Sequence, residues 1–248
     1  MINNVSYNDC IQELSIVIPA YNEESNLARI VLEAEAVLKN HAAERLEWIL
    51  VDDGSTDSTW SEITNLADSM PDVIPLKHTT NRGLGAALWT GMAQASSEWC
   101  TWMPADGQFA PQSYVDMMRF AEGSDLVILM RDDDRAWQRR ILTIMMYGLM
   151  RIVLGFDAYG YSGVFLVRRR ILQDVPLYST TGVQNFAVVL HCQKNEYRIQ
   201  QTCTVIQPRM SGKSKVSNVP TMLKVFYDIM KLTRQSNQGQ EGGSDRDE

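Results

Sequence analysis

Acidic side chains directly follow two apolar runs near the start of the chain. In "SIVIPAYNEES" the apolar run is followed by Tyr21 and Glu23. In "WILVDDGSTD" the apolar run is followed by Asp53. Carboxylates in such turns can accept hydrogen bonds from a base N–H or from ribose hydroxyls, and the ring of Tyr21 can pack against a base. These residue types therefore indicate a nucleotide site built from two turns.

A structural alternative exists for the same turns. Ser25 and Asp57 are suited to cap the helices that follow, because their side-chain oxygens can accept the first free N–H groups of a helix. The remaining acids would then be solvated residues that complement the helix N-termini. The pairing of two acidic turns favours nucleotide binding over this alternative.

A third polar turn, "MPADGQFAP", offers ligands for a metal ion. Asp106 and Gln108 flank a glycine that permits a tight turn, and carboxylate and amide oxygens are hard ligands suited to Mg²⁺ or Mn²⁺. Such an ion takes most of its other ligands from substrate phosphate. The structural alternative is an ordinary Asp-Gly turn that enters a helix at Pro111.

The glycine-containing stretch "NRGLGAAL" is a weak phosphate-binding signal, because no Lys-Ser/Thr follows it as in a P-loop. Gly83 and Gly85 are therefore interpreted as helix-start residues that allow a close approach to the site.

The elements between these turns must position them. Short apolar runs at 14–20, 47–53, 73–79, 99–106 and 125–130 alternate with segments of helical period at 25–40, 58–70 and 83–95. Continuous β-branched runs separated by amphipathic helices predict an α/β fold with a mostly parallel central sheet, flanked by helices and buried on both faces. In such sheets the ligand binds beyond the carboxyl ends of the strands, where the polar turns lie.

Composition bounds the class of protein. The 248 residues, 45% of them hydrophobic, can fill the core of one domain. The formal charge of −7 argues against non-specific nucleic-acid binding, which needs a basic surface. Acidic residues crowd the first half and basic residues the second, which suits a substrate with metal-linked phosphates. The first fifteen residues lack the features of a secretory leader, so a cytosolic start is expected.

Six segments, in this order, resemble family 2 glycosyltransferases of the GT-A fold, a Rossmann-like nucleotide-diphospho-sugar transferase fold: "SIVIPAYNEESNL", "VDDGSTDST", "NRGLGAAL", "ADGQFAP", "SGVFLVRR" and "PRMSGKSK". The likeness spans about residues 14 to 216 and is greatest to the dolichol-phosphate mannosyltransferase branch of polyprenyl-phosphate sugar transferases. It implies a donor-nucleotide site made by Pro19, Tyr21, Glu23 and Asp53. It also implies that Asp106 and Gln108 bind Mg²⁺ or Mn²⁺ on the donor diphosphate.

The same resemblance assigns roles to basic residues. With Asp106, the implied catalytic residues are those that would hold an acceptor phosphate: Arg131, Arg139 and Thr143. A later loop would close on the donor diphosphate and offset charge on the departing nucleotide, through Arg209, Lys213 and Lys215. The structural alternative for that loop is a solvated basic surface.

Two later segments are unusually apolar. The one at about 136–154 is too short for a membrane span and predicts either a core helix or an amphipathic interface helix, the second of which is adopted in the organisation below. In "TMLKVFYDIMKL", helical spacing places Lys224, Asp228 and Lys231 on one side and apolar residues largely on the other. The expected organisation is a GT-A catalytic domain over 1–216, followed over 217–248 by this amphipathic helix and a disordered polar tail.

The function predicted from these features is that of an inverting glycosyltransferase, a hexosyltransferase. It would move a sugar from a UDP- or GDP-sugar to a polyprenyl phosphate at the cytosolic face of a membrane. A lipid phosphate is already anionic near neutral pH, so positioning and leaving-group stabilisation can do most of the work. Peripheral contact with the membrane surface follows, with a membrane-anchoring partner or a homo-oligomer left open.

Two alternatives remain open from the sequence. The first keeps the nucleotide-sugar donor but sends the sugar to a soluble glycan or a small-molecule hydroxyl. The second is a catalytically silent sugar-nucleotide-binding subunit. It is motivated by Pro104, because the family usually has Asp-x-Asp where this chain reads Pro104-Ala105-Asp106.

Overall fold

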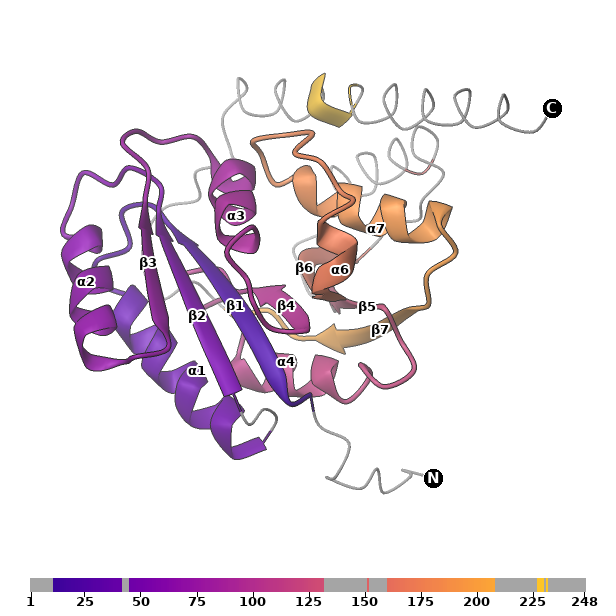
Figure 1. Ribbon diagram of the computed structural model, residues 1–248, viewed down its shortest axis with the longest axis horizontal. Helices are drawn as coiled ribbons and strands as arrows, with labels where there is room; N and C mark the ends of the chain where they lie inside the picture. The colour runs from indigo at the N-terminus through magenta and orange to yellow at the C-terminus, as the bar shows by residue number, and fades with distance from the viewer. Residues whose placement is uncertain are drawn as a thin grey trace.

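The computed structural model describes residues 11–41, 45–131, 151, 160–207, 227–229 and 231. Within these residues the chain forms a seven-stranded sheet with the strand order β3-β2-β1-β4-β6-β5-β7. Helices cover both faces of this sheet (Figure 1). The predicted α/β architecture is therefore confirmed.

The strands are β1 (Glu13–Ala20), β2 (Arg45–Asp52), β3 (Val73–Lys77), β4 (Trp99–Trp102), β5 (Leu126–Arg131), β6 (Tyr161–Arg168) and β7 (Ile199–Thr204). The helices are α1 (Leu27–His41), α2 (Thr59–Ser69), α3 (Leu84–Met92), α4 (Pro111–Met118), α6 (Arg169–Leu172) and α7 (Gln184–Lys194). In Figure 1, α1, α2 and α4 lie on one side of the sheet, and α3, α6 and α7 lie on the other.

The central strands follow directly from their apolar runs. In β1 and β2 every residue after the first is buried, as expected for parallel strands covered on both faces. The strand predicted at 99–106 ends earlier, at Trp102. Pro104 has no N–H to donate to a strand ladder, so the chain leaves the sheet before it and forms the polar turn.

Of the strands beyond β4, β5 was predicted from its apolar run, whereas β6 and β7 were not. β6 runs antiparallel to both of its neighbours, β4 and β5, whereas β7 runs parallel to β5. Because of this reversal, β6 begins at the edge where β1, β2, β4 and β5 end. The start of β6, from Gly160 to Gly163, therefore lies at the predicted ligand edge.

Helix α3 packs very closely on the sheet. A Cβ atom added at Gly91 would lie 2.3 Å from Cγ1 of Val17 on β1. Any side chain at this position would therefore force the helix or the strand to move. This contact holds the C-terminal end of α3 directly on β1 and β2.

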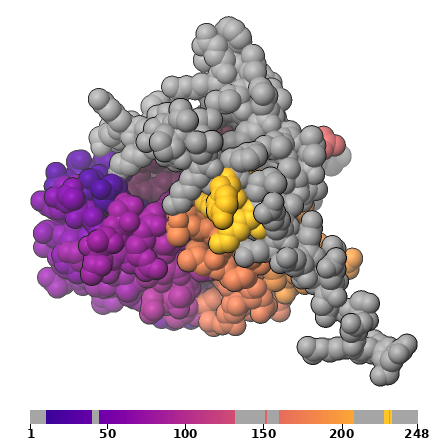
Figure 2. All heavy atoms as spheres, turned by 90° about the horizontal axis from the view of Figure 1, so that it is seen from above, coloured from indigo at the N-terminus to yellow at the C-terminus, as the bar shows by residue number. Residues whose placement is uncertain are grey.

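The short helical stretch at residues 227–229 lies against the part of the chain that precedes α7, shown in yellow beside orange in Figure 2. Asp228 is only 7% exposed. Its Oδ2 accepts hydrogen bonds from Ser179 Oγ at 2.6 Å and Thr181 Oγ1 at 3.0 Å. Helical spacing placed Asp228 on the polar side of the segment with Lys224 and Lys231. Its carboxylate is buried instead, because the two hydroxyls donate hydrogen bonds to it.

At the opposite edge of the sheet from the polar turns, a buried carboxylate ties two strands and the loop before β4 together. Glu47 on β2 accepts hydrogen bonds from Ser15 Oγ and from the Oγ and N–H of Ser96. Burial alone would raise the pKa of Glu47, but these hydrogen bonds and the charge of Arg45 outweigh burial, so its pKa lies below the ordinary value.

Replacing Glu47 with glutamine is expected to lower the free energy of unfolding at pH 7 by about 2 kcal/mol. Because the folded-state pKa is depressed, the stabilisation is complete above the ordinary pKa of about 4.3 and is lost as the pH falls through the folded-state pKa. Urea unfolding at pH 7 and near pH 3.5 should therefore show the difference between wild type and E47Q shrinking with acid. The control is E33Q on α1, whose exposed pair with Arg29 should contribute little at either pH; a pH-independent difference for E47Q would contradict this assignment.

Candidate functional site

The turns after β1 and β2 lie side by side and are joined by hydrogen bonds. The Asn22 N–H donates to Ser55 Oγ at 3.0 Å, and the Thr56 N–H donates to Asn22 Oδ1 at 2.8 Å. The Glu23 N–H donates to Thr59 Oγ1 at 2.8 Å. The two acidic turns predicted to converge are thus held as one unit at the carboxyl edge of the sheet.

Part of the helix-capping alternative also holds within this unit. Asp57 Oδ1 accepts the N–H of Thr59, the first residue of α2, at 3.0 Å, and Glu24 Oε2 accepts the N–H of Ser58 at 2.8 Å. Burial alone would raise the pKa of Asp57, but the hydrogen bonds from Thr59 and from the Glu24 N–H outweigh burial and lower it. Asp57 and Glu24 therefore stabilise the start of α2.

Tyr21 and Glu23 belong to the first turn and are both half-buried. Glu23 Oε2 accepts a hydrogen bond from Asn26 Nδ2 at 2.9 Å, which orients the carboxylate. Pro19 is the penultimate residue of β1, paired with Val51 of β2. These three predicted donor residues therefore lie within one short segment beside the β2 turn.

The Asp53 carboxylate faces the interior of the protein and does not face the open edge of the sheet. It is 3% exposed, and its carboxylate accepts hydrogen bonds from His78 Nδ1 at 2.7 Å, the Arg82 N–H at 2.9 Å and the Gly83 N–H at 2.8 Å. His78 Nε2 in turn lies 3.0 Å from Thr90 Oγ1 on α3. Asp53 therefore fastens the 79–83 loop and the start of α3 to the end of β2.

The preceding residue, Asp52, belongs to the same predicted acidic turn, but only Asp53 was assigned to the donor nucleotide. It is 1% exposed; Oδ1 accepts the Ser55 N–H at 2.8 Å, while Oδ2 is buried without a hydrogen-bond partner among the described residues. Of the two adjacent acids, Asp52 thus has the spare acceptor oxygen. Only its position as the last residue of the apolar run could have pointed to it.

The third turn provides the candidate metal ligands. Asp106 and Gln108 are half-buried, Gly107 between them has a positive φ of 70°, and Asp106 Oδ1 accepts the Gln108 N–H at 3.1 Å. The turn leads into α4 at Pro111, so the turn of the structural alternative is present too. Nearby, burial and then the charge of Asp106 raise the pKa of Tyr114.

One carboxylate and one amide on an accessible turn fit the limited protein ligand set of Mg²⁺ or Mn²⁺, which draw on phosphate and water for the rest. No group of three or more His, Cys, Asp or Glu side chains placed to hold a metal occurs in the described ranges. A metal at this turn would therefore depend on the substrate for much of its coordination.

The predicted phosphate-binding residues are only partly described. Arg131 ends β5 at the same edge as the acidic turns, is half-buried, and donates its backbone N–H to the Gly160 carbonyl. The others lie outside the described residues: Arg139, Thr143, Arg209, Lys213 and Lys215. The predicted interface helix at 136–154 also lies outside them, apart from the exposed, helical Arg151.

Gly83 and Gly85 allow a close approach, but by another loop of the protein. A Cβ atom at Gly85 would lie 2.5 Å from the carbonyl oxygens of Ser179 and Thr181, and the Gly85 N–H donates to the Thr180 carbonyl at 2.9 Å. The Gly83 N–H is held by Asp53. These N–H groups at the start of α3 are thus satisfied by the protein, in agreement with the absence of a P-loop sequence.

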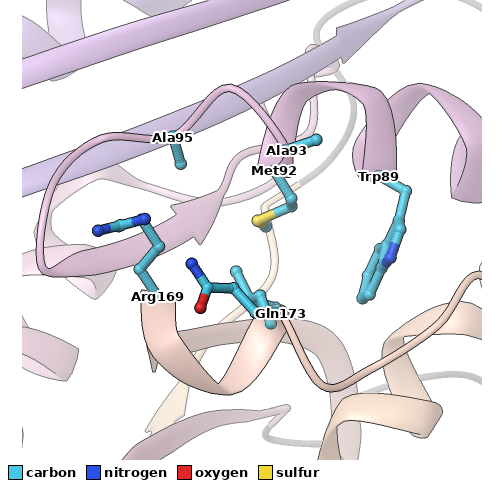
Figure 3. A pocket seen from close by; sticks show the side chains of 7 residues that line it. Trp89, Met92, Ala93, Ala95, Arg169 and Gln173 are labelled. Atoms are coloured by element: carbon cyan, nitrogen blue, oxygen red, sulfur yellow. The ribbon is translucent and has the colours of Figure 1, made fainter.

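A cavity of about 360 Å³ lies away from these turns, between α3 and α6 (Figure 3). Its lining includes Trp89, Met92, Arg169 and Gln173. Arg169 follows the end of β6, at the opposite edge of the sheet, and its Nε donates to the Ser97 carbonyl at 3.2 Å. None of the predicted site residues lines this cavity, so it is not part of the candidate site.

Comparison with known proteins gives consistent matches. Residues 15–176 match the profile of Glycosyl transferase family 2. The undecaprenyl-phosphate 4-deoxy-4-formamido-L-arabinose transferase of Yersinia pestis is 34% identical over 233 residues, covering 91% of this chain and 69% of that protein. The dolichol-phosphate mannosyltransferase of Pyrococcus furiosus is 26% identical over 230 residues, covering 88% and 64%. Four of the matched relatives are longer proteins, of which the chain spans 46% to 65%.

Solved structures share the fold at lower identity. Glucosyl-3-phosphoglycerate synthase from Mycobacterium tuberculosis, in complex with Mn²⁺, uridine diphosphate and phosphoglyceric acid, superposes with a TM-score of 0.69 at 18% identity, covering 90% of this chain and 78% of that one. Mannosyl-3-phosphoglycerate synthase from Rubrobacter xylanophilus gives a TM-score of 0.67 at 15% identity, covering 95% and 77%.

Proposed function

Because the chain belongs to glycosyl transferase family 2 and has the GT-A fold, we propose that it transfers a sugar from a UDP- or GDP-sugar to a polyprenyl phosphate, with inversion at the anomeric carbon. The observation that carries the proposal is the interlocked pair of acidic turns at the carboxyl edge of the sheet, beside the turn of Asp106. Relatives named as polyprenyl-phosphate sugar transferases support the acceptor.

On the donor side, Pro19, Tyr21 and Glu23 would bind the nucleoside. Asp53 would act through the loop that it anchors, with Asp52 supplying a free acceptor oxygen. Asp106 and Gln108 would hold Mg²⁺ or Mn²⁺, which when bound neutralises charge on the donor diphosphate. The predicted basic residues Arg209, Lys213 and Lys215 would close on the same diphosphate.

On the acceptor side, Arg131, Arg139 and Thr143 would orient the lipid phosphate. A phosphate oxygen attacks the anomeric carbon as the bond from that carbon to the nucleotide oxygen breaks, and the nucleoside diphosphate leaves. The second phosphate pKa is near 6, so the attacking oxygen is anionic at neutral pH and requires no proton transfer to a base. Positioning by guanidinium groups then supplies much of the acceleration.

The proposed setting is the cytosolic face of a membrane. The segments at 136–154 and 217–248 would contact the membrane surface, and an anchoring partner or a second copy of the chain would help to hold the protein there. No helix within the described residues combines the length and apolar character needed to cross a membrane.

A thermal-shift panel tests the donor assignment. UDP, GDP and their glucose, galactose and mannose conjugates are added with and without Mn²⁺, because a ligand that binds only the native state raises the melting temperature. At 100 times its Kd a true donor adds about 2.7 kcal/mol of stability, and Mn²⁺ is expected to enlarge the shift. A chain that responds to none of these compounds at millimolar concentration would not be a transferase of this kind.

Replacing Arg139 with alanine is expected to weaken use of the acceptor by about tenfold to a hundredfold, because a charge-assisted hydrogen bond to phosphate contributes about 1.5–3 kcal/mol. Transfer to undecaprenyl phosphate and to dolichyl phosphate in detergent would be measured at varied acceptor concentration, with donor binding measured separately. R29A, on the exposed face of α1, is the matched arginine control. Equal losses of acceptor use and donor binding in R139A would argue against this role.

A soluble acceptor is the second candidate. The fold neighbour bound to phosphoglyceric acid supports it, because that ligand also carries a phosphate group. Transfer in the absence of lipid or detergent would favour it. Donor binding with neither transfer nor slow donor hydrolysis, under either metal, would instead identify a silent binding subunit.

A further inference from the structure

Two adjacent buried amides in the first turn of α7 differ in how they are satisfied. Gln184 is fully buried; its Oε1 accepts the N–H groups of Tyr178 at 2.8 Å and Ser179 at 3.0 Å, and its Nε2 donates to the Pro176 carbonyl at 2.9 Å. Asn185 is 3% exposed, and its Oδ1 is buried with no hydrogen-bond partner in the described part of the chain. Gln184 therefore has a structural role that Asn185 lacks.

Asn185 lies against the start of β6, at the ligand edge of the sheet. Its Nδ2 would be 3.4 Å from a Cβ atom at Gly163, a residue whose φ is +90°. Trp102 Nε1 donates to the backbone carbonyl of Gly163 at 2.9 Å. The Tyr161 hydroxyl donates to the backbone carbonyl of Asn185 at 3.4 Å. β6 pairs with β4, the strand that leads into the Asp106 turn. The amide is thus one strand away from the proposed metal ligands.

The chemistry of the unpaired atom restricts its partner. A buried carbonyl oxygen without a hydrogen bond costs about 1–3 kcal/mol, and such atoms in folded proteins are usually satisfied by a bound group or an ordered water. Oδ1 can only accept, so its partner must donate a hydrogen. Sugar hydroxyls donate, whereas a diphosphate or a lipid phosphate at neutral pH offers acceptor oxygens.

We infer that Asn185 Oδ1 accepts a hydrogen bond from a hydroxyl of the transferred sugar, so that Asn185 is a specificity-determining residue of the donor site. The inference rests on the proposed function. It separates recognition of the sugar, by Asn185 from the α7 side, from recognition of the nucleotide, by the turns after β1 and β2.

The test compares N185L with wild type in three measurements. The first is the melting temperature without ligand, which should stay the same or rise, because leucine removes an unsatisfied polar group at similar volume. The second is the affinity for UDP and GDP, which should not change. The third is the extra affinity gained from the sugar of UDP-glucose or GDP-mannose, which should fall by roughly tenfold.

Monodeoxy analogues of the two donors identify the hydroxyl. Wild type should discriminate against one analogue, and N185L should bind that analogue and the parent donor equally well, as in a double-mutant cycle. N185D keeps an acceptor oxygen of the same shape and should retain the discrimination. N195L, at the exposed far end of α7, is the control and should behave as wild type does.

The outcomes separate the two proposals. Wild type that binds no nucleotide or nucleotide sugar would overturn the proposed function and this inference with it. Wild type that binds donors, together with an N185L variant whose sugar-dependent affinity is unchanged, would overturn the inference alone. A marked drop in the melting temperature of N185L with deoxy discrimination intact would show a structural role and overturn it as well.

Discussion

Replacing Asp106 with alanine is expected to reduce sugar transfer by on the order of 10³-fold, about 4 kcal/mol of transition-state stabilisation. Asp106 is the carboxylate of the proposed metal pair, and Pro104 occupies the position of a second one, so no neighbouring acid in the Pro104–Asp106 stretch can take over. The rate would be measured at saturating donor with Mg²⁺ and, separately, with Mn²⁺. Nucleotide binding without metal should be much less affected.

D116A is the matched control for this variant. Asp116 is on α4, ten residues further along the same segment, with a partly exposed side chain paired to Arg119 at 3.0 Å. Its loss should leave both the rate and the melting temperature nearly unchanged. An undiminished rate for D106A with either metal would show that the assigned metal role is wrong.

Replacing Asp53 with alanine is expected to lower the free energy of unfolding by about 4 kcal/mol, because removing one partner of a buried, hydrogen-bonded charge leaves the others unsatisfied. The groups left behind are the His78 ring and the N–H groups of Arg82 and Gly83. Urea unfolding measures the loss, with the exposed Asp68 on α2 as the alanine control.

The same variant series separates two roles for Asp53. If Asp53 anchors the loop, D53N should lose stability together with nucleotide affinity, because an asparagine side chain has one acceptor oxygen where the carboxylate has two. If it contacts the nucleotide directly, D53N should lose affinity with little loss of stability. Loss of affinity at unchanged stability would contradict the anchoring role.

The strands could be predicted where burial on both faces of the sheet requires a continuous apolar run. β1 and β2 are buried on both faces, and their apolar runs gave their positions to within two residues. Hydropathy does not record strand direction, however, so the antiparallel β6 could not be placed from its apolar run. Its reversal is set by pairing with β4 and β5, which are distant in sequence.

The meeting of the polar turns at one edge of the sheet could be predicted from the sequence, but their detailed contacts could not. Polar residues after apolar runs located the edge, because strand ends share it. The 79–83 loop takes up the Asp53 carboxylate and leaves Asp52 Oδ2 without a partner among the described residues, and Asn185 Oδ1 is likewise left without one beside the start of β6. Both are set by tertiary contacts, which a single sequence does not contain.

The burial of Asp228 has a practical consequence for work on this protein. The loop that receives its carboxylate, at residues 179–181, is the one that packs on Gly83 and Gly85 at the start of α3. Shortening the chain before Tyr227 would remove the carboxylate to which both hydroxyls donate and is expected to loosen that loop. Residues 227–229 therefore support the loop that packs on the start of α3, and expression vectors should retain them.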